Sequence, residues 1–153
     1  MKITFNCGVI VKRAKKKAFS DFIAQKGLKS TRQRDIILDF FLSSAQHMSL
    51  EELYLKLRAK HPGIGYATVY RTLKLFAESG IAREIQFGDG QTRYEQVSEG
   101  EHHDHLVCTR CGAIAEFENE TIEKLQDEVA AAYGFLIETH KLELYGLCAK
   151  CRK

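Results

Sequence analysis

The sequence of 153 residues lacks any apolar run close to the roughly 18 residues that a membrane-spanning helix requires. It also lacks a signal-peptide pattern, because the basic cluster near its start follows a short apolar stretch and no small-residue cleavage site comes after it. These two absences predict a cytoplasmic protein with no membrane partner, in which the cysteines stay reduced.

Familiar catalytic patterns are missing as well. The sequence contains no H-E-x-x-H metalloprotease motif, no deaminase signature and no obvious second catalytic base. We therefore expect no enzymatic activity and no small-molecule substrate. A metalloenzyme in which clustered histidine and aspartate activate water is one alternative, and a zinc-storage or interaction module is another.

Charge is unevenly distributed along the chain, although the net charge is only +3. Residues 1–95 hold 17 Lys+Arg and 9 Asp+Glu, a balance of +8, whereas residues 96–153 hold 6 and 11, a balance of −5. Hydrophobic residues make up 44% of the chain, which allows a core in one domain or in two small ones. The basic half indicates a polyanionic partner, and the acidic half suits hard cations.

Three helices are predicted in the first part of the basic half. Apolar residues at helical spacing place the first over about 15–26 and the second over about 31–42. The third begins at Ser49, because Ser49 and Glu52 form a capping box. The only proline of the chain lies in the segment HPGIG, residues 61–65, which predicts a turn.

A fourth helix is predicted over residues 66–80, YATVYRTLKLFAESG. One of its faces is apolar, and another is small, aromatic and basic without an acid: Ala67, Tyr70, Arg71 and Lys74. A helix that enters a DNA major groove needs such a face. Alternating residues on both sides of the turn at 88–90 then predict a β-hairpin, which completes a winged helix-turn-helix. The alternative for the basic face is an ordinary solvated helix surface.

The acidic half opens with a dense cluster of potential metal ligands in HHDHLVCTRC, residues 102–111. Because side chains alternate between the faces of an extended chain, His102 and Asp104 are expected on one face and His103 and His105 on the other. The segment HHDH therefore predicts two sites, back to back across one strand.

Four cysteines form two C-x-x-C pairs: Cys108, Cys111, Cys148 and Cys151. Together they can close a tetrahedral S₄ site, which favours structural Zn²⁺. A redox dithiol is the alternative. The fifth cysteine, Cys7, stands apart and receives no role.

Five more residues could complete the two other sites: His47, Glu95, Glu116, Glu123 and His140. We expect Glu116 in a strand over 113–118, Glu123 in the first turn of a helix that starts near residue 120, and His140 in a strand over 135–148. Ile122, Leu125 and Val129 of that helix are expected to face inward. Taken singly, each of the five has an ordinary structural explanation.

Several segments together resemble the ferric uptake regulator (Fur) family of metal-dependent repressors: ATVYRTLKLFAESGI, RYE, HHDHLVCTRCG, EF and LYGLCAKC. The resemblance covers about residues 15–151. It implies an α+β fold, with an N-terminal winged helix-turn-helix DNA-binding domain at 1–96, of which 1–14 is an extra segment. A hinge at 97–101 and a C-terminal α/β dimerisation domain at 102–153 follow.

The resemblance also implies the ligand sets. The structural zinc site matches the four paired cysteines. The regulatory site matches His47, Glu95, His103, His105 and Glu116. An additional metal site matches His102, Asp104, Glu123 and His140. The DNA contacts match Lys29, Tyr70 and Arg71.

By the same resemblance, we expect a repressor that binds double-stranded operator DNA as a homodimer, or as a higher oligomer on DNA, and controls iron homeostasis genes. Peroxide sensors of the family usually carry aspartate at the positions of Glu95 and Glu116, so glutamate there favours Fe²⁺ as the regulatory metal. Mn²⁺, Co²⁺ and Zn²⁺ suit the same ligands, and a peroxide- or zinc-sensing member is the alternative.

Overall fold

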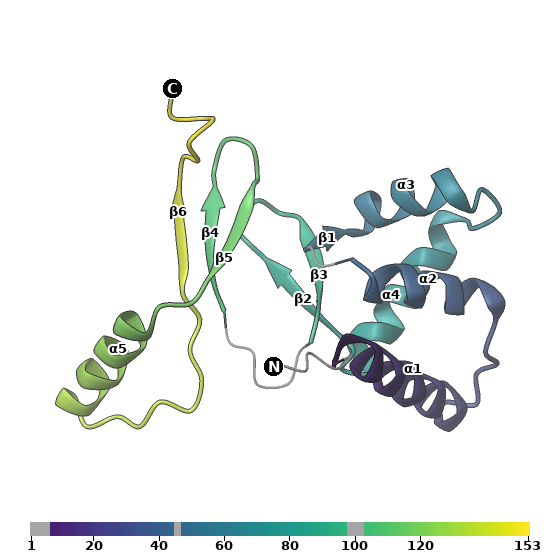
Figure 1. Ribbon diagram of the computed structural model, residues 1–153, viewed down its shortest axis with the longest axis horizontal. Helices are drawn as coiled ribbons and strands as arrows, with labels where there is room; N and C mark the ends of the chain where they lie inside the picture. The colour runs from purple at the N-terminus through teal and green to yellow at the C-terminus, as the bar shows by residue number, and fades with distance from the viewer. Residues whose placement is uncertain (1–6, 45–46, 98–102) are drawn as a thin grey trace, which may run out of the picture. The chain divides into compact units, whose positions relative to one another are not determined.

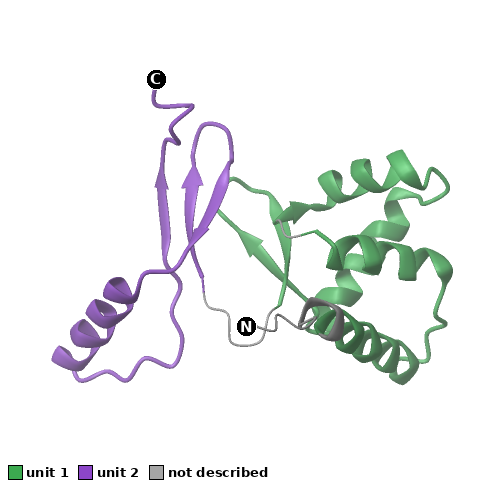
Figure 2. Cartoon of the chain, viewed as in Figure 1, with its two compact units in different colours: residues 1–98 green, residues 99–153 purple. Residues whose placement is uncertain are grey.

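The structure is a computed structural model that describes residues 7–44, 47–97 and 103–153. The chain divides into two compact units, residues 1–98 and 99–153, shown in different colours in Figure 2. The division falls within the predicted hinge, of which residues 98–101 lie outside the described part of the chain. Each unit is described by itself.

Unit 1 carries the four predicted helices (Figure 1): α1 (Cys7–Gln25), α2 (Arg32–Leu42), α3 (Leu50–Lys60) and α4 (Tyr66–Glu78). The largest difference from the prediction is the start of α1, which begins at Cys7 instead of residue 15. The added turns contain Lys12, whose Nζ atom lies 3.6 Å from the Asp39 carboxylate on α2. Lys16 forms an ion pair with the same carboxylate.

Two of these helices begin at side-chain caps. The Thr31 side chain accepts a hydrogen bond from the Arg34 backbone N–H at the start of α2. At the start of α3, Ser49 and Glu52 form the predicted capping box, in which each side chain accepts a hydrogen bond from the other residue's backbone N–H. Polar residues with no role in the core therefore set where both helices start.

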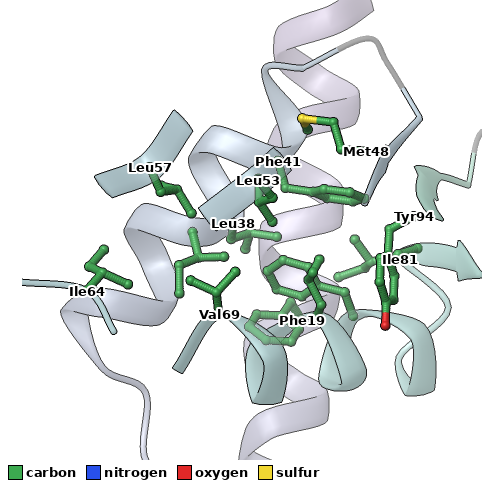
Figure 3. Packing of buried hydrophobic residues seen from close by; sticks show 14 of the residues in the cluster. Phe19, Leu38, Phe41, Met48, Leu53, Leu57, Ile64, Val69, Ile81 and Tyr94 are labelled. Carbon is green, nitrogen blue, oxygen red and sulfur yellow. The ribbon is translucent and has the colours of Figure 1, made fainter. Parts of the chain in front are cut away.

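The core of unit 1 forms where the apolar faces of the helices meet (Figure 3). The ring centroids of Phe19 and Phe76 lie 4.9 Å apart in an edge-to-face contact, and those of Phe41 and Phe76 lie 5.4 Å apart. Phe76 thus joins α4 to both α1 and α2. The buried apolar residues of α4 fall on its predicted apolar face: Val69, Leu73 and Phe76.

A three-stranded sheet completes unit 1 in the order β1-β3-β2. It contains β1 (Met48–Ser49), β2 (Ala82–Gln86) and β3 (Thr92–Gln96), all antiparallel. The β2–β3 hairpin is the predicted wing. Gly88 and Gly90 both adopt a φ of +75° in its loop, a conformation that glycine accepts without strain.

Unit 2 has a second three-stranded sheet, in the order β5-β4-β6, and one helix. Its elements are β4 (Asp104–Cys108), β5 (Ile114–Phe117), α5 (Glu120–Ala132) and β6 (Glu143–Gly146). Strand β4 is central, antiparallel to β5 and parallel to β6. The overall class is therefore α+β, as predicted.

Two predictions for unit 2 are wrong. The last strand covers only Glu143–Gly146, so His140 lies in the irregular segment before it and not in a strand. The apolar residues of α5 do not all face inward, because Leu125 is 53% exposed and Val129 is 59% exposed. Helical periodicity identified an apolar face correctly but could not say whether this chain or another molecule covers it.

In the described part of the chain, no helix is both long and apolar enough to cross a membrane.

Replacing Phe76 by alanine should lower the free energy of unfolding of unit 1 by about 3–5 kcal/mol, because the substitution leaves a cavity between three helices. Urea unfolding followed by circular dichroism measures this change. The control is Leu55→Ala on α3, whose side chain is 57% exposed and should cost no more than about 0.5 kcal/mol. Equal effects of the two substitutions would contradict this account of the core.

Candidate metal centres and nucleic-acid interface

The two C-x-x-C pairs come together at one end of the unit 2 sheet. Cys108 ends β4, whereas Cys148 follows β6, which runs parallel to β4. The sulfur atoms of all four cysteines lie within 4.8 Å of one another. Cys111 Sγ and Cys148 Sγ are 3.8 Å apart. Four sulfurs at about 2.3 Å from a tetrahedral zinc ion would be separated by about 3.8 Å, so this cluster fits Zn²⁺.

The thiol chemistry of the cluster also fits a metal site. The Cys148 backbone N–H points at Cys108 Sγ over 3.3 Å and, with the N–H groups of Cys111 and Arg110, lowers the pKa of Cys108 to about 6. Hydrogen bonding with the Cys111 and Cys148 thiols raises the pKa of Cys151 to about 12. The backbone therefore stabilises one thiolate, and crowding opposes ionisation of the last thiol until a cation is present.

In unit 1, the sheet register brings His47 and Glu95 together. Met48 pairs with Tyr94, so one residue further along the same antiparallel ladder His47 falls opposite Glu95. His47 Nε2 lies 2.5 Å from Glu95 Oε2. A neutral imidazole and a carboxylate placed this close together can offer a divalent cation two ligand atoms.

The other oxygen of Glu95 contacts a residue that sequence reasoning missed. Arg83 pairs with Glu95 in the β2–β3 register, and its Nε atom lies 3.3 Å from Glu95 Oε1. Glu95 is thus held between an arginine on β2 and a histidine that directly precedes β1. Counting residues outward from the predicted wing turn would have paired Arg83 with Glu95, because hairpin register follows from loop length.

In unit 2, the other three predicted regulatory residues lie at the end of the sheet where β4 begins and β5 finishes. The rings of His103 and His105 are 5.0 Å apart. Glu116 on β5 pairs with His105 on β4, so their side chains leave the same face of the sheet. His103, His105 and Glu116 belong to unit 2, whereas His47 and Glu95 belong to unit 1.

Sequence reasoning also missed Glu143 on β6. It pairs with His105 on the edge of β4 opposite to β5. Burial favours its neutral form, but Lys141 and Tyr145 donate hydrogen bonds to it and the nearby His105 adds positive charge, so the pKa of Glu143 falls below its ordinary value. In the sequence, the signal that could have identified Glu143 is a single acid among the mainly apolar residues of LELYG.

The additional site is assembled within unit 2. Asp104, Glu123 and His140 each place a ligand atom within 4.8 Å of the others. His140 Nε2 lies 3.3 Å from Glu123 Oε2 and 3.9 Å from Asp104 Oδ1. The fourth predicted member, His102, lies outside the described residues. Asp104 and His105 are neighbours on β4, so their membership of different clusters agrees with the predicted alternation.

The predicted DNA-contacting residues are exposed on unit 1. Tyr70 is 46% exposed, and Arg71 is exposed beside it on α4. Lys29 is exposed in the connection between α1 and α2. The opposite face of α4 is buried in the core, so this helix presents its aromatic and basic side chains outward.

Comparison with known proteins is consistent with this arrangement. Residues 25–145 match the model of the Ferric uptake regulator family. The chain belongs to this family. It is 46% identical over 128 residues to the ferric uptake regulation protein of Bordetella parapertussis, covering 83% of this chain and 91% of that protein. It is 34% identical over 131 residues to the peroxide operon regulator of Bacillus subtilis, covering 86% and 89%.

Among solved structures, the Helicobacter pylori ferric uptake regulator Fur matches with a TM-score of 0.80 and 29% identity, covering 100% of this chain and 98% of that one. Three functional metal binding sites are described for that protein. The chain is accordingly a metal-dependent transcriptional regulator of the Fur family, and the resemblance drawn from its motifs is confirmed.

Replacing Cys148 by serine should remove tightly bound zinc and loosen unit 2, because the binding free energy of a structural zinc, about 10 kcal/mol or more in small zinc domains, is coupled to folding. Elemental analysis after dialysis measures the zinc, and amide hydrogen exchange in β4 and β6 measures the loosening. Cys7→Ser is the control, since Cys7 lies outside the two C-x-x-C pairs. Full zinc content and unchanged exchange in the Cys148 variant would contradict the assignment.

Proposed function

We propose that this chain is an iron-responsive repressor that acts in the cytoplasm and binds operator DNA as a homodimer. The observation that carries the proposal is the distribution of nitrogen and oxygen ligands over two units. His47 and Glu95 form a pair in unit 1, and His103, His105 and Glu116 gather at one end of the sheet in unit 2. Neither set by itself offers the five or six ligands that Fe²⁺ commonly takes.

One regulatory ion shared by both sets would require the two units to be brought together. His47 and Glu95 move with the DNA-binding unit, and His103 and His105 move with the other unit. In a dimer, a shared ion would therefore select one separation of the two copies of α4, the helix proposed to enter the major groove and called the recognition helix below. Shifting such an equilibrium from 1:99 to 99:1 takes about 5.5 kcal/mol of preference for one state. Several ligands acting together can supply that preference.

Iron is favoured over the other signals by two observations. The chain is more similar to the ferric uptake regulation protein of Bordetella parapertussis than to the peroxide operon regulator of Bacillus subtilis. Glutamate rather than aspartate stands at positions 95 and 116. Peroxide sensing is the second candidate, because identity to that peroxide regulator is still 34%. No step of the proposal requires catalysis by the chain.

The experiment that tests the proposal is anaerobic operator binding. Protein with zinc at the cysteines alone is titrated with Fe²⁺, Mn²⁺ or Zn²⁺ at fixed salt, and its binding to an AT-rich inverted repeat is followed by fluorescence anisotropy. Binding that appears at micromolar Fe²⁺ and survives mild peroxide is the expected result. Activation only by sub-nanomolar Zn²⁺, or loss of binding on histidine oxidation, would replace iron by zinc or peroxide as the signal.

Replacing His105 by alanine should abolish the metal-dependent increase in operator affinity, because the variant loses the central ligand of the unit 2 set. Dimerisation and zinc content should not change. His61→Ala is the matched control, since His61 caps the end of α3 and belongs to none of the three ligand sets. Undiminished metal-dependent binding by the His105 variant would exclude His105 as a regulatory ligand.

The homodimer has its own test in the exposed apolar face of α5. Val129 is 59% exposed and Leu125 53%, and Tyr133 and Leu136, which follow along the chain, are 79% and 90% exposed. Leu125 and Val129 lie one turn apart on α5, and exposed apolar side chains at such spacing favour a partner surface. A DNA inverted repeat calls for two copies. Val129→Glu should therefore shift sedimentation to a monomer, whereas Lys124→Glu on the polar face should not. A Val129→Glu dimer would place the interface elsewhere.

A further inference from the structure

The exposed face of the recognition helix carries a lysine that is already paired. Lys74 stands four residues after Tyr70 and three after Arg71, so the three side chains share one side of α4. Lys74 Nζ lies 2.8 Å from Glu84 Oε1 on β2, the first strand of the wing. The same Nζ atom lies 6.0 Å from the centroid of the Tyr70 ring. Glu84 thus places a carboxylate beside a face of α4 that has no acidic residue of its own.

Glu84 also contacts a buried residue of the neighbouring strand. It pairs with Tyr94 in the β2–β3 register, and Tyr94 is only 3% exposed in the core of unit 1. Burial raises the pKa of Tyr94 to about 12, and the negative charge of Glu84 contributes to the rise, so the phenol stays protonated beside the carboxylate. The carboxylate is thus fixed between a buried tyrosine and the recognition helix.

This ion pair does little for stability. The side chains of Lys74 and Glu84 are 42% and 35% exposed, and pairs at such exposure contribute weakly because water and salt screen them. The position of the ion pair bears on DNA binding more than its strength bears on stability. A carboxylate at the junction of recognition helix and wing repels phosphate, whereas a free lysine there would attract it on any DNA sequence.

Taking the proposed DNA-binding function as given, we propose that Glu84 is a specificity-determining residue that holds Lys74 back from phosphate contacts. Lysine is a point charge, and its phosphate contacts add affinity without sequence information. With Lys74 paired to Glu84 and lying along Tyr70, the flat groups of Tyr70 and Arg71 are left to read the operator. Glu84 thereby lowers binding to unrelated DNA more than binding to the operator.

The test is Glu84→Gln in the full-length protein, loaded with zinc and with whichever regulatory metal activates the wild type. Affinities for the operator and for an unrelated duplex are measured by anisotropy between 50 and 200 mM salt. A freed Lys74 that gains one phosphate should steepen the log–log salt dependence on unrelated DNA by about 0.9, which is about a threefold to fourfold change over this salt range. The operator-to-unrelated affinity ratio should fall.

Two controls separate this effect from a general change of charge. Glu78→Gln removes one negative charge from the same unit by breaking the exposed ion pair between Lys26 and Glu78, and it should leave the ratio unchanged. The double variant Lys74→Gln/Glu84→Gln should return the salt dependence to the wild-type value, because the freed cation is then absent.

Each outcome decides the matter. A steeper salt dependence and a lower ratio in Glu84→Gln, both reversed in the double variant, support the inference. Wild-type ratio and slope in Glu84→Gln, or a steeper slope that persists in the double variant, overturn it while leaving the DNA-binding function intact. Failure of the wild-type protein to bind the operator with any metal overturns the proposed function itself, and is seen before any variant is measured.

Discussion

The period-two alternation of side chains along β4 is the constraint on which the metal chemistry of this chain depends. Asp104 and His105 are adjacent in sequence, yet the pleat directs them to opposite faces of one strand. Asp104 meets Glu123 and His140 on one side, and His105 lies beside Glu116 on the other. A shift of one residue in register would exchange the two sets and leave both without a complete group of ligands.

The two units differ in what stabilises them. Unit 1 buries a continuous set of aromatic and aliphatic side chains, centred on Phe76, and needs no cofactor to explain its stability. In the described part of unit 2, the buried hydrophobic residues are only Val107 and Cys108, and Leu125 and Val129 of α5 remain exposed. A unit with so little core depends on other sources of free energy. The cysteine cluster, if it holds zinc, and the proposed second copy of the chain are two such sources.

Local rules predicted most of unit 1, because there each rule agrees with the packing. The capping box at Ser49 and the apolar face of α4 both lie where the sequence places them. Unit 2 was predicted less well because periodicity reports which residues are apolar and not what covers them. The exposure of Leu125 and the short last strand before Cys148 both depend on contacts beyond local sequence. Spacing identified the sulfur ligands, but not their mutual distances.

Arg83 and Glu143 were missed for a related physical reason: both act through cross-strand register, which joins residues far apart in sequence. Each places a charged group beside a proposed ligand, Arg83 beside Glu95 and Glu143 beside His105. Groups in this position fix the orientation of a ligand and adjust the charge of its site. Proteins of one family can therefore share ligands and still differ in metal preference, and residues such as these, next to the ligands, are where such differences would arise.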